Sequence, residues 1–147
     1  MKRPLPACLW EGPFLVLLTS LATLAADPPA ANPPAAGPLE SAQRLLQTGK
    51  YDEAQEAFAA LPDTLAVERA LGIARAQTAL GERDKAVAAL TAAAEKQPMS
   101  AALIAELSRL ALAAGQYDRA AEQAAAALKL APENVLATWV EAEVAAA

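Results

Sequence analysis

One six-residue segment occurs three times in this chain: GKYDEA at residues 49–54, GERDKA at 81–86 and GQYDRA at 115–120. The glycines that open successive copies are 32 and then 34 residues apart. A fixed period of about 20–50 residues indicates stacked supersecondary units, because each unit buries its apolar face only against its neighbours. The repeat therefore predicts a solenoid.

Each period carries the signals of two helices. The glycine supplies the left-handed conformation that ends a first helix, and an acidic residue in the first turn suits the start of a second. Proline, a stop signal, then follows at Pro62, Pro98 and Pro132. We expect helices at about 39–48, 51–60, 64–80, 83–97, 100–114, 117–130 and 133–146. The predicted fold class is all-α, an antiparallel helix-hairpin solenoid with a disordered N-terminal tail.

Composition and periodicity agree with this fold. Hydrophobic residues make up 55% of the chain and aromatic residues only 4%, so much of the core is alanine, the best helix former. In the third unit, apolar residues recur at helical spacing on two faces that we expect to meet. These are Ile104, Leu107, Ala111 and Ala114 on one helix, and Ala120, Ala124, Ala127 and Leu128 on the other.

The pattern resembles the tetratricopeptide repeat (TPR) family. The family pattern has a glycine followed by an aromatic residue at the turn, and this chain matches it with Gly49/Tyr51 and Gly115/Tyr117. The pattern also has a small residue in the middle of the first helix, which Ala74 and Ser108 match. Small residues of the second helix are matched by Ala54, Ala86, Ala93, Ala120 and Ala127, and the bulky residue between them by Phe58 or Leu90. Two departures are Arg83 in place of the turn tyrosine and Ala124 in place of the bulky residue.

The resemblance covers residues 39–147. It divides them into units at about 39–66, 67–100 and 101–134, followed by a capping helix at 135–147. The first unit is two residues short, and the last stops after its first helix. A generic alanine-rich helical bundle is the alternative interpretation.

The N-terminus resembles a secretory signal peptide at residues 1–26. Lys2 and Arg3 precede an apolar run from Phe14 to Ala26 that ends in small residues. We expect cleavage near Ala25 or Ala26, which predicts a secreted or periplasmic protein. The alternative is an uncleaved segment that anchors the protein in the inner membrane. Residues 27–38 contain five prolines and predict an extended linker.

The composition argues against several functions. The formal charge is −5 without a basic stripe, which is unfavourable for nucleic acid, whose phosphates need clustered Lys and Arg. The chain has no histidine and one cysteine, Cys8, so it offers no histidine-based nucleophile pair and no Cys or His zinc site. The glycines form no phosphate-binding loop. We expect no catalytic residues, no metal and no cofactor, and the protein is predicted not to be an enzyme.

The resemblance implies that the first helix of each unit lines a concave groove that holds a peptide or protein segment. By register, the predicted groove residues are Gln43, Glu68, Leu71, Arg75, Glu106, Arg109, Leu112 and, on the last helix, Trp139. Gln43, Arg75 and Arg109 occupy equivalent positions. We hypothesise that the two arginines pair with carboxylates of a bound segment, since arginine suits bidentate carboxylate contacts. The alternative is pairing inside the groove with Glu68, Glu106 or Glu141.

The last predicted helix lacks a polar outer face, which a capping helix needs for solubility. Trp139, Val140 and Val144 are therefore expected to be uncovered. Either this surface is an interface, through self-association or with a partner, or the chain is cut from a longer array.

Together these features predict a TPR-like scaffold of the bacterial cell envelope that binds a protein or peptide. It would touch a membrane only through an uncleaved signal segment. The alternatives are a non-catalytic N-terminal part of a larger exported enzyme or secretion component, and a self-associating structural protein.

Overall fold

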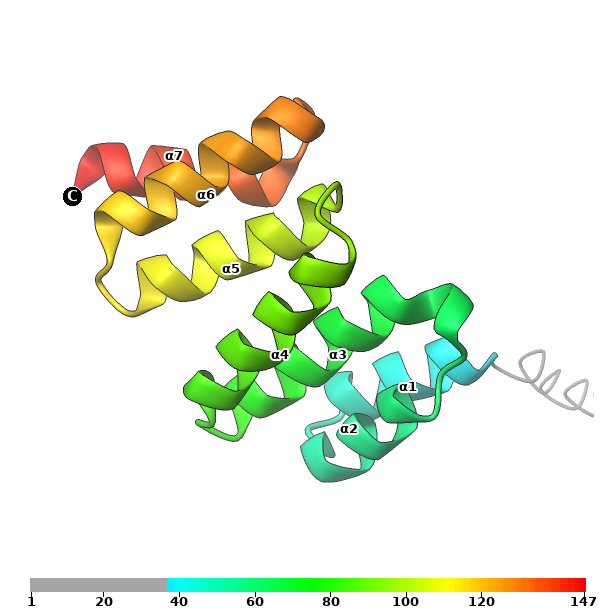
Figure 1. Cartoon of the computed structure of the whole chain (residues 1–147). Helices are drawn as coiled ribbons and strands as arrows, with labels where there is room; N and C mark the ends of the chain where they lie inside the picture. The colour runs from blue at the N-terminus through cyan, green and yellow to red at the C-terminus, as the bar shows by residue number, and fades with distance from the viewer. Residues whose placement is uncertain (1–36) are drawn as a thin grey trace, which may run out of the picture. The chain divides into compact units, whose positions relative to one another are not determined.

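The computed structural model describes residues 37–147. The predicted signal peptide, and the linker up to residue 36, lie outside the described residues. The helices are α1 (Pro38–Gln47), α2 (Tyr51–Ala59), a short 3₁₀ helix (Asp63–Leu65), α3 (Ala66–Ala79), α4 (Arg83–Lys96), α5 (Ala101–Ala113), α6 (Tyr117–Leu130) and α7 (Val135–Ala146) (Figure 1). No strand occurs within this range. The all-α prediction is confirmed, and each predicted helix is present with ends within two residues.

The three repeated turns have the expected geometry. The three turn glycines have positive φ values: 79° at Gly49, 83° at Gly81 and 75° at Gly115. Residues with a Cβ rarely adopt this backbone conformation. After each glycine, a backbone N–H reaches back five residues: Lys50 to the Leu45 carbonyl at 3.0 Å, for example. This bond is typical of the Schellman motif that closes a helix. The repeated segment therefore ends each first helix in the same way.

Helix α1 begins at Pro38, a residue that we assigned to the linker. Proline is favoured in the first turn of a helix, where its missing N–H has no helical partner and its fixed φ is already helical. The proline that we placed at the end of the linker is therefore the first residue of the array.

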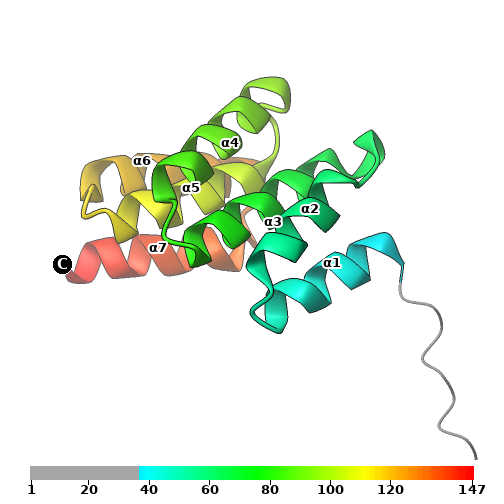
Figure 2. The same cartoon turned by 90° about the horizontal axis from the view of Figure 1, so that it is seen from below.

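The helices form two layers of consecutive antiparallel pairs. The first helices of the units contact one another in the order α1, α3, α5 and α7, and each second helix packs against the first helices before and after it. In Figure 2, α1 and α7 lie along the lower edge, and α4 and α6 along the upper edge. One layer is thus lined by first helices and the other by second helices.

The core consists of three clusters, one for each group of three consecutive helices. Phe58 and Leu61 lead the cluster of α1 to α3, and Leu90, Leu103 and Leu110 that of α3 to α5. The cluster of α5 to α7 is almost all alanine, with Ala105, Ala111, Ala120, Ala124, Ala127, Ala137 and Val140. Our assignment of Leu107 and Ala114 to the contact with α6 is wrong. Leu107 packs in the middle cluster, because it points back toward α4, and Ala114 is exposed.

Helix α7 packs its own inner face on α5 and α6. Val140, expected to be uncovered, is 0% exposed, and Val144 is partly buried against the same cluster. That expectation is wrong because α7 rests on both preceding helices and needs no following helix to cover these two residues. The Asn134 side chain caps α7 by accepting a hydrogen bond from the Ala137 backbone N–H at 3.0 Å.

Gly72 sets the approach of α2 to α3. A Cβ at this position would overlap the ring of Phe58, which is itself 2% exposed. The absence of a side chain at Gly72 therefore makes room for the largest side chain of the first cluster.

Candidate binding groove

A pocket of about 100 Å³ lies between α1 and α3, with Phe58 of α2 contributing to its lining. Its lining residues are Leu39, Gln43, Leu46, Phe58, Glu68, Leu71, Gly72 and Arg75. Four predicted groove residues, Gln43, Glu68, Leu71 and Arg75, thus line one pocket. We call the surface formed by this pocket and by Glu106 and Arg109 the groove.

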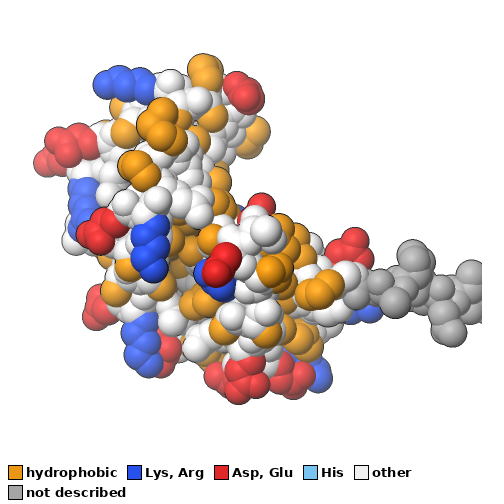
Figure 3. Space-filling model, turned by 45° about the vertical axis from the view of Figure 1, so that its right-hand side comes forward, with side chains coloured by type: hydrophobic (Ala, Val, Ile, Leu, Met, Phe, Trp, Pro, Cys, Tyr) orange, Lys and Arg blue, Asp and Glu red, His pale blue; other side chains and the backbone are white. Residues whose placement is uncertain are grey.

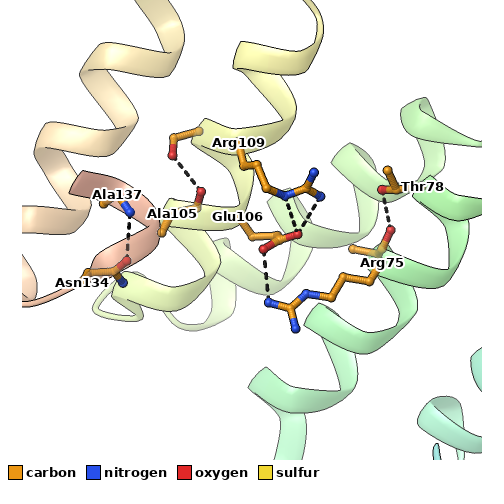
Figure 4. A network of polar contacts seen from close by, with 9 residues as sticks. Arg75, Thr78, Ala105, Glu106, Arg109, Asn134 and Ala137 are labelled. Atoms are coloured by element: carbon orange, nitrogen blue, oxygen red, sulfur yellow. Dashed lines mark hydrogen bonds and ion pairs between the residues drawn. The ribbon is translucent and has the colours of Figure 1, made fainter. Parts of the chain in front are cut away.

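Arg75 of α3 and Arg109 of α5 converge on the carboxylate of Glu106 (Figure 4). Arg109 donates from Nε and Nη2 to Oε1 at 3.0 and 2.7 Å. Arg75 donates from Nη2 to Oε2 at 3.4 Å, across the gap between α3 and α5. Glu106 therefore joins two units of the array, and Arg109 holds it more closely than Arg75 does.

Exposure differs strongly among these three side chains. The Glu106 side chain is 2% exposed, that of Arg109 27% and that of Arg75 52%. Of the two pairings that the sequence left open, the structure has the arginines paired inside the groove, with Glu106. Two guanidinium groups on one carboxylate leave a formal charge of +1, and Arg75 keeps several N–H donors free to face a partner.

The other two predicted residues lie further along the array. Leu112 is partly buried against the cluster of α5 to α7, where it supports the packing of these helices. Trp139 is 46% exposed on α7. Their role in binding stays a prediction.

Four residues of the pocket were not predicted from the sequence to line the groove. Leu39 and Leu46 were missed, although they lie four residues before and three residues after Gln43, spacings that put them on the same helical face. That spacing was the available signal. Phe58 and Gly72 reach the pocket only because α2 and α3 approach so closely, and no local pattern predicts this.

The described part of the chain offers no site for a metal ion, since no three His, Cys, Asp or Glu side chains cluster within residues 37–147. In the same range, no helix has the length and hydrophobicity needed to span a membrane. Figure 3 shows one face of the surface, on which acidic and basic side chains are interspersed with hydrophobic ones.

Comparison with known proteins bears on the fold. Residues 105–147 match the family model of the tetratricopeptide repeat. No curated protein matches the chain.

Several solved structures share the fold. The type III secretion chaperone SycD of Yersinia enterocolitica, in complex with a peptide of the translocator YopD, superposes with a TM-score of 0.60 at 21% identity, over 74% of this chain and 85% of that chain. PcrH of Pseudomonas aeruginosa superposes with a TM-score of 0.60 at 22% identity, over 74% of this chain and 84% of that chain. PcrH in complex with the chaperone-binding region of PopB superposes with a TM-score of 0.58 at 22% identity, over 74% of this chain and 90% of that chain. The chain thus has a TPR-like all-α fold.

Proposed function

We propose that this protein is a non-enzymatic scaffold that binds a segment of another protein in the groove. The observation that carries the proposal is the pocket in which Gln43, Glu68, Leu71 and Arg75 meet. It offers an apolar floor with polar groups at its rim, the combination by which small sites fix a ligand. Two similar structures, SycD and PcrH, are complexes with a translocator peptide and with a chaperone-binding region, which supports a peptide as the ligand.

The groove can be tested by photo-crosslinking in the native cell. Benzoylphenylalanine in place of Gln43, an exposed groove residue, should give a discrete crosslinked product. The same residue in place of Glu56, exposed on α2, serves as the matched control. Products of the same size from both positions, or no product from Gln43, would contradict the proposal.

The crosslinked segment can then be synthesised and its affinity measured by fluorescence anisotropy. We expect Arg75→Ala to weaken binding by at least about tenfold, which corresponds to about 1.4 kcal/mol, because Arg75 is half exposed beside the pocket. The control is Lys129→Ala, which removes an exposed cation on α6 and should leave the affinity unchanged. Equal affinities of wild type and Arg75→Ala would rule out a contribution of Arg75.

Self-association through α7 is a second candidate, favoured by the exposure of Val135 (82%) and Trp139 (46%). Exposed apolar residues close together mark interaction surfaces. Light scattering of the full chain should then give a mass above the monomer that falls in the Trp139→Glu variant. An unchanged mass would exclude this surface.

We also propose that the protein is exported, on the basis of the residues 1–26 alone. Fractionation of the native cells should recover it from the periplasm or the medium, with an N-terminus near Asp27. A protein recovered intact with the membrane would instead support the uncleaved anchor, and one recovered intact in the cytoplasm would contradict export.

A further inference from the structure

A second cavity, of about 280 Å³, lies between the start of α4, the end of α5 and the start of α6. We call it the α4–α6 pocket. Its floor is apolar, with Val87, Leu107 and Leu110, and Arg83 and Arg119 stand at its rim. Since an α-helix turns about 100° per residue, Leu107 and Arg109 point to opposite sides of α5. The pocket therefore opens on the side of the array away from the groove.

The corresponding place between the first two units is more nearly filled. There Tyr51 and Leu80 line a space of only about 140 Å³. The repeat aligns Tyr51 with Arg83 and Leu80 with Ala114. A half-buried ring and a leucine are thus replaced by an exposed cation and an alanine. With these two substitutions the α4–α6 pocket stays open above its floor, in which Val87 is partly exposed and Leu107 and Leu110 are 8% and 3% exposed.

The charges also differ between the α4–α6 pocket and the corresponding place between the first two units. Between the first two units, Lys85 pairs with Glu82 at 2.6 Å. The repeat aligns Glu82 with Gln116 and Lys85 with Arg119. Arg119 therefore contacts a neutral side-chain amide, that of Gln116, at 3.4 Å. Within the described residues, neither Arg83 nor Arg119 forms an ion pair. With Asp84 also in the lining, the pocket carries a formal charge of +1.

We propose that the α4–α6 pocket binds an apolar side chain of a partner protein that is flanked by acidic residues. The apolar side chain would fill the pocket against Val87, Leu107 and Leu110, and the neighbouring carboxylates would accept hydrogen bonds from the two guanidinium groups. An apolar anchor in a pocket with a charged rim is a common arrangement at protein interfaces. The site is separate from the groove, so the scaffold would hold two segments at once.

The test is a titration of the ¹⁵N-labelled full chain with acetyl-Glu-Leu-Glu-amide, followed by NMR. Saturable shifts are expected for the backbone amides of Val87, Leu110 and Ala114. The control peptides acetyl-Lys-Leu-Lys-amide and acetyl-Glu-Ser-Glu-amide change only the charge or only the apolar side chain. We expect each to bind at least about tenfold more weakly, a difference of the size that one lost contact produces.

Variants of the chain separate the two parts of the site. Arg83→Tyr with Ala114→Leu rebuilds the filled arrangement of the preceding units and should abolish saturable shifts. Arg119→Gln should weaken binding of the acidic peptide but not of acetyl-Lys-Leu-Lys-amide. Equal shifts with all three peptides, or no saturable shift at these amides, would overturn the proposal. Shifts confined to Gln43, Leu71 and Arg75 would also overturn it, while leaving the groove proposal intact.

Discussion

Glu106 places a charge in an interior built from alanine and leucine. Removing a charged side chain from water costs several kcal/mol unless partners replace the lost hydration. Arg109 supplies most of that replacement with two hydrogen bonds to one oxygen, whereas the contact from Arg75 is longer and more exposed. The three residues thus contribute unequally to stability.

We expect Arg109→Met to lower the free energy of unfolding by about 3 kcal/mol, because it leaves Glu106 buried with one long contact. Arg75→Met should cost less than about 1 kcal/mol, as for an exposed ion pair. Urea denaturation measures both, and Arg119→Met is the control for loss of an exposed arginine. Equal losses for Arg109→Met and Arg75→Met would contradict this ranking. Adding Glu106→Leu to Arg109→Met should recover stability, since apolar residues can replace a buried ion pair.

Gly72 is the second residue on which the packing depends. Gly72→Ala should destabilise the array by about 1–3 kcal/mol through overlap with Phe58, although alanine is the better helix former. Thermal unfolding followed by circular dichroism would detect the loss. Phe58→Leu should be less costly in the Gly72→Ala background than in the wild type, and equal costs in both would show that the two residues do not interact.

At the scale of the element, α7 has one buried face and one exposed face. Val140→Ala should cost about 2 kcal/mol, from lost methyl burial and the cavity left among alanines. Val135→Ala makes the same chemical change at a residue that is 82% exposed and should change stability by less than about 0.5 kcal/mol. Similar losses in chemical denaturation would mean that α7 is not docked as described.

At the scale of the whole array, each cluster joins only three consecutive helices. Stability should then be a sum of unit and nearest-neighbour contributions. Hydrogen exchange of the Val140→Ala variant should be faster in α5 to α7 and unchanged in α1 and α2. Uniformly faster exchange would instead indicate a single cooperative unit.

The elements were predictable because their signals are local. Gly49, Gly81 and Gly115 each mark a turn by the conformation that the residue itself adopts, and the prolines after the second helices act over a few residues. These signals do not depend on how the helices pack, so the helix boundaries agree closely with the structure.

What depends on packing could be predicted only in part. The register of the first helices placed Gln43 and Arg75 on one surface. The burial of Glu106 depends on the distance between α3 and α5, which no residue near it in sequence specifies. Val140 was assigned the wrong exposure because the faces of α7 were judged without the position of α5. The departure at Arg83 was visible in the repeat, but its consequence, an open pocket, required the structure.

The alanine contacts between α5, α6 and α7 restrict how this sequence can change over generations. Glycine is the only smaller residue that a single base change in an alanine codon can produce, and every other amino-acid replacement enlarges the side chain between two backbones. The buried alanines of this cluster therefore tolerate few replacements. Adaptation to new partners is therefore left to the surface positions, which can vary while the spacing of the helices stays fixed.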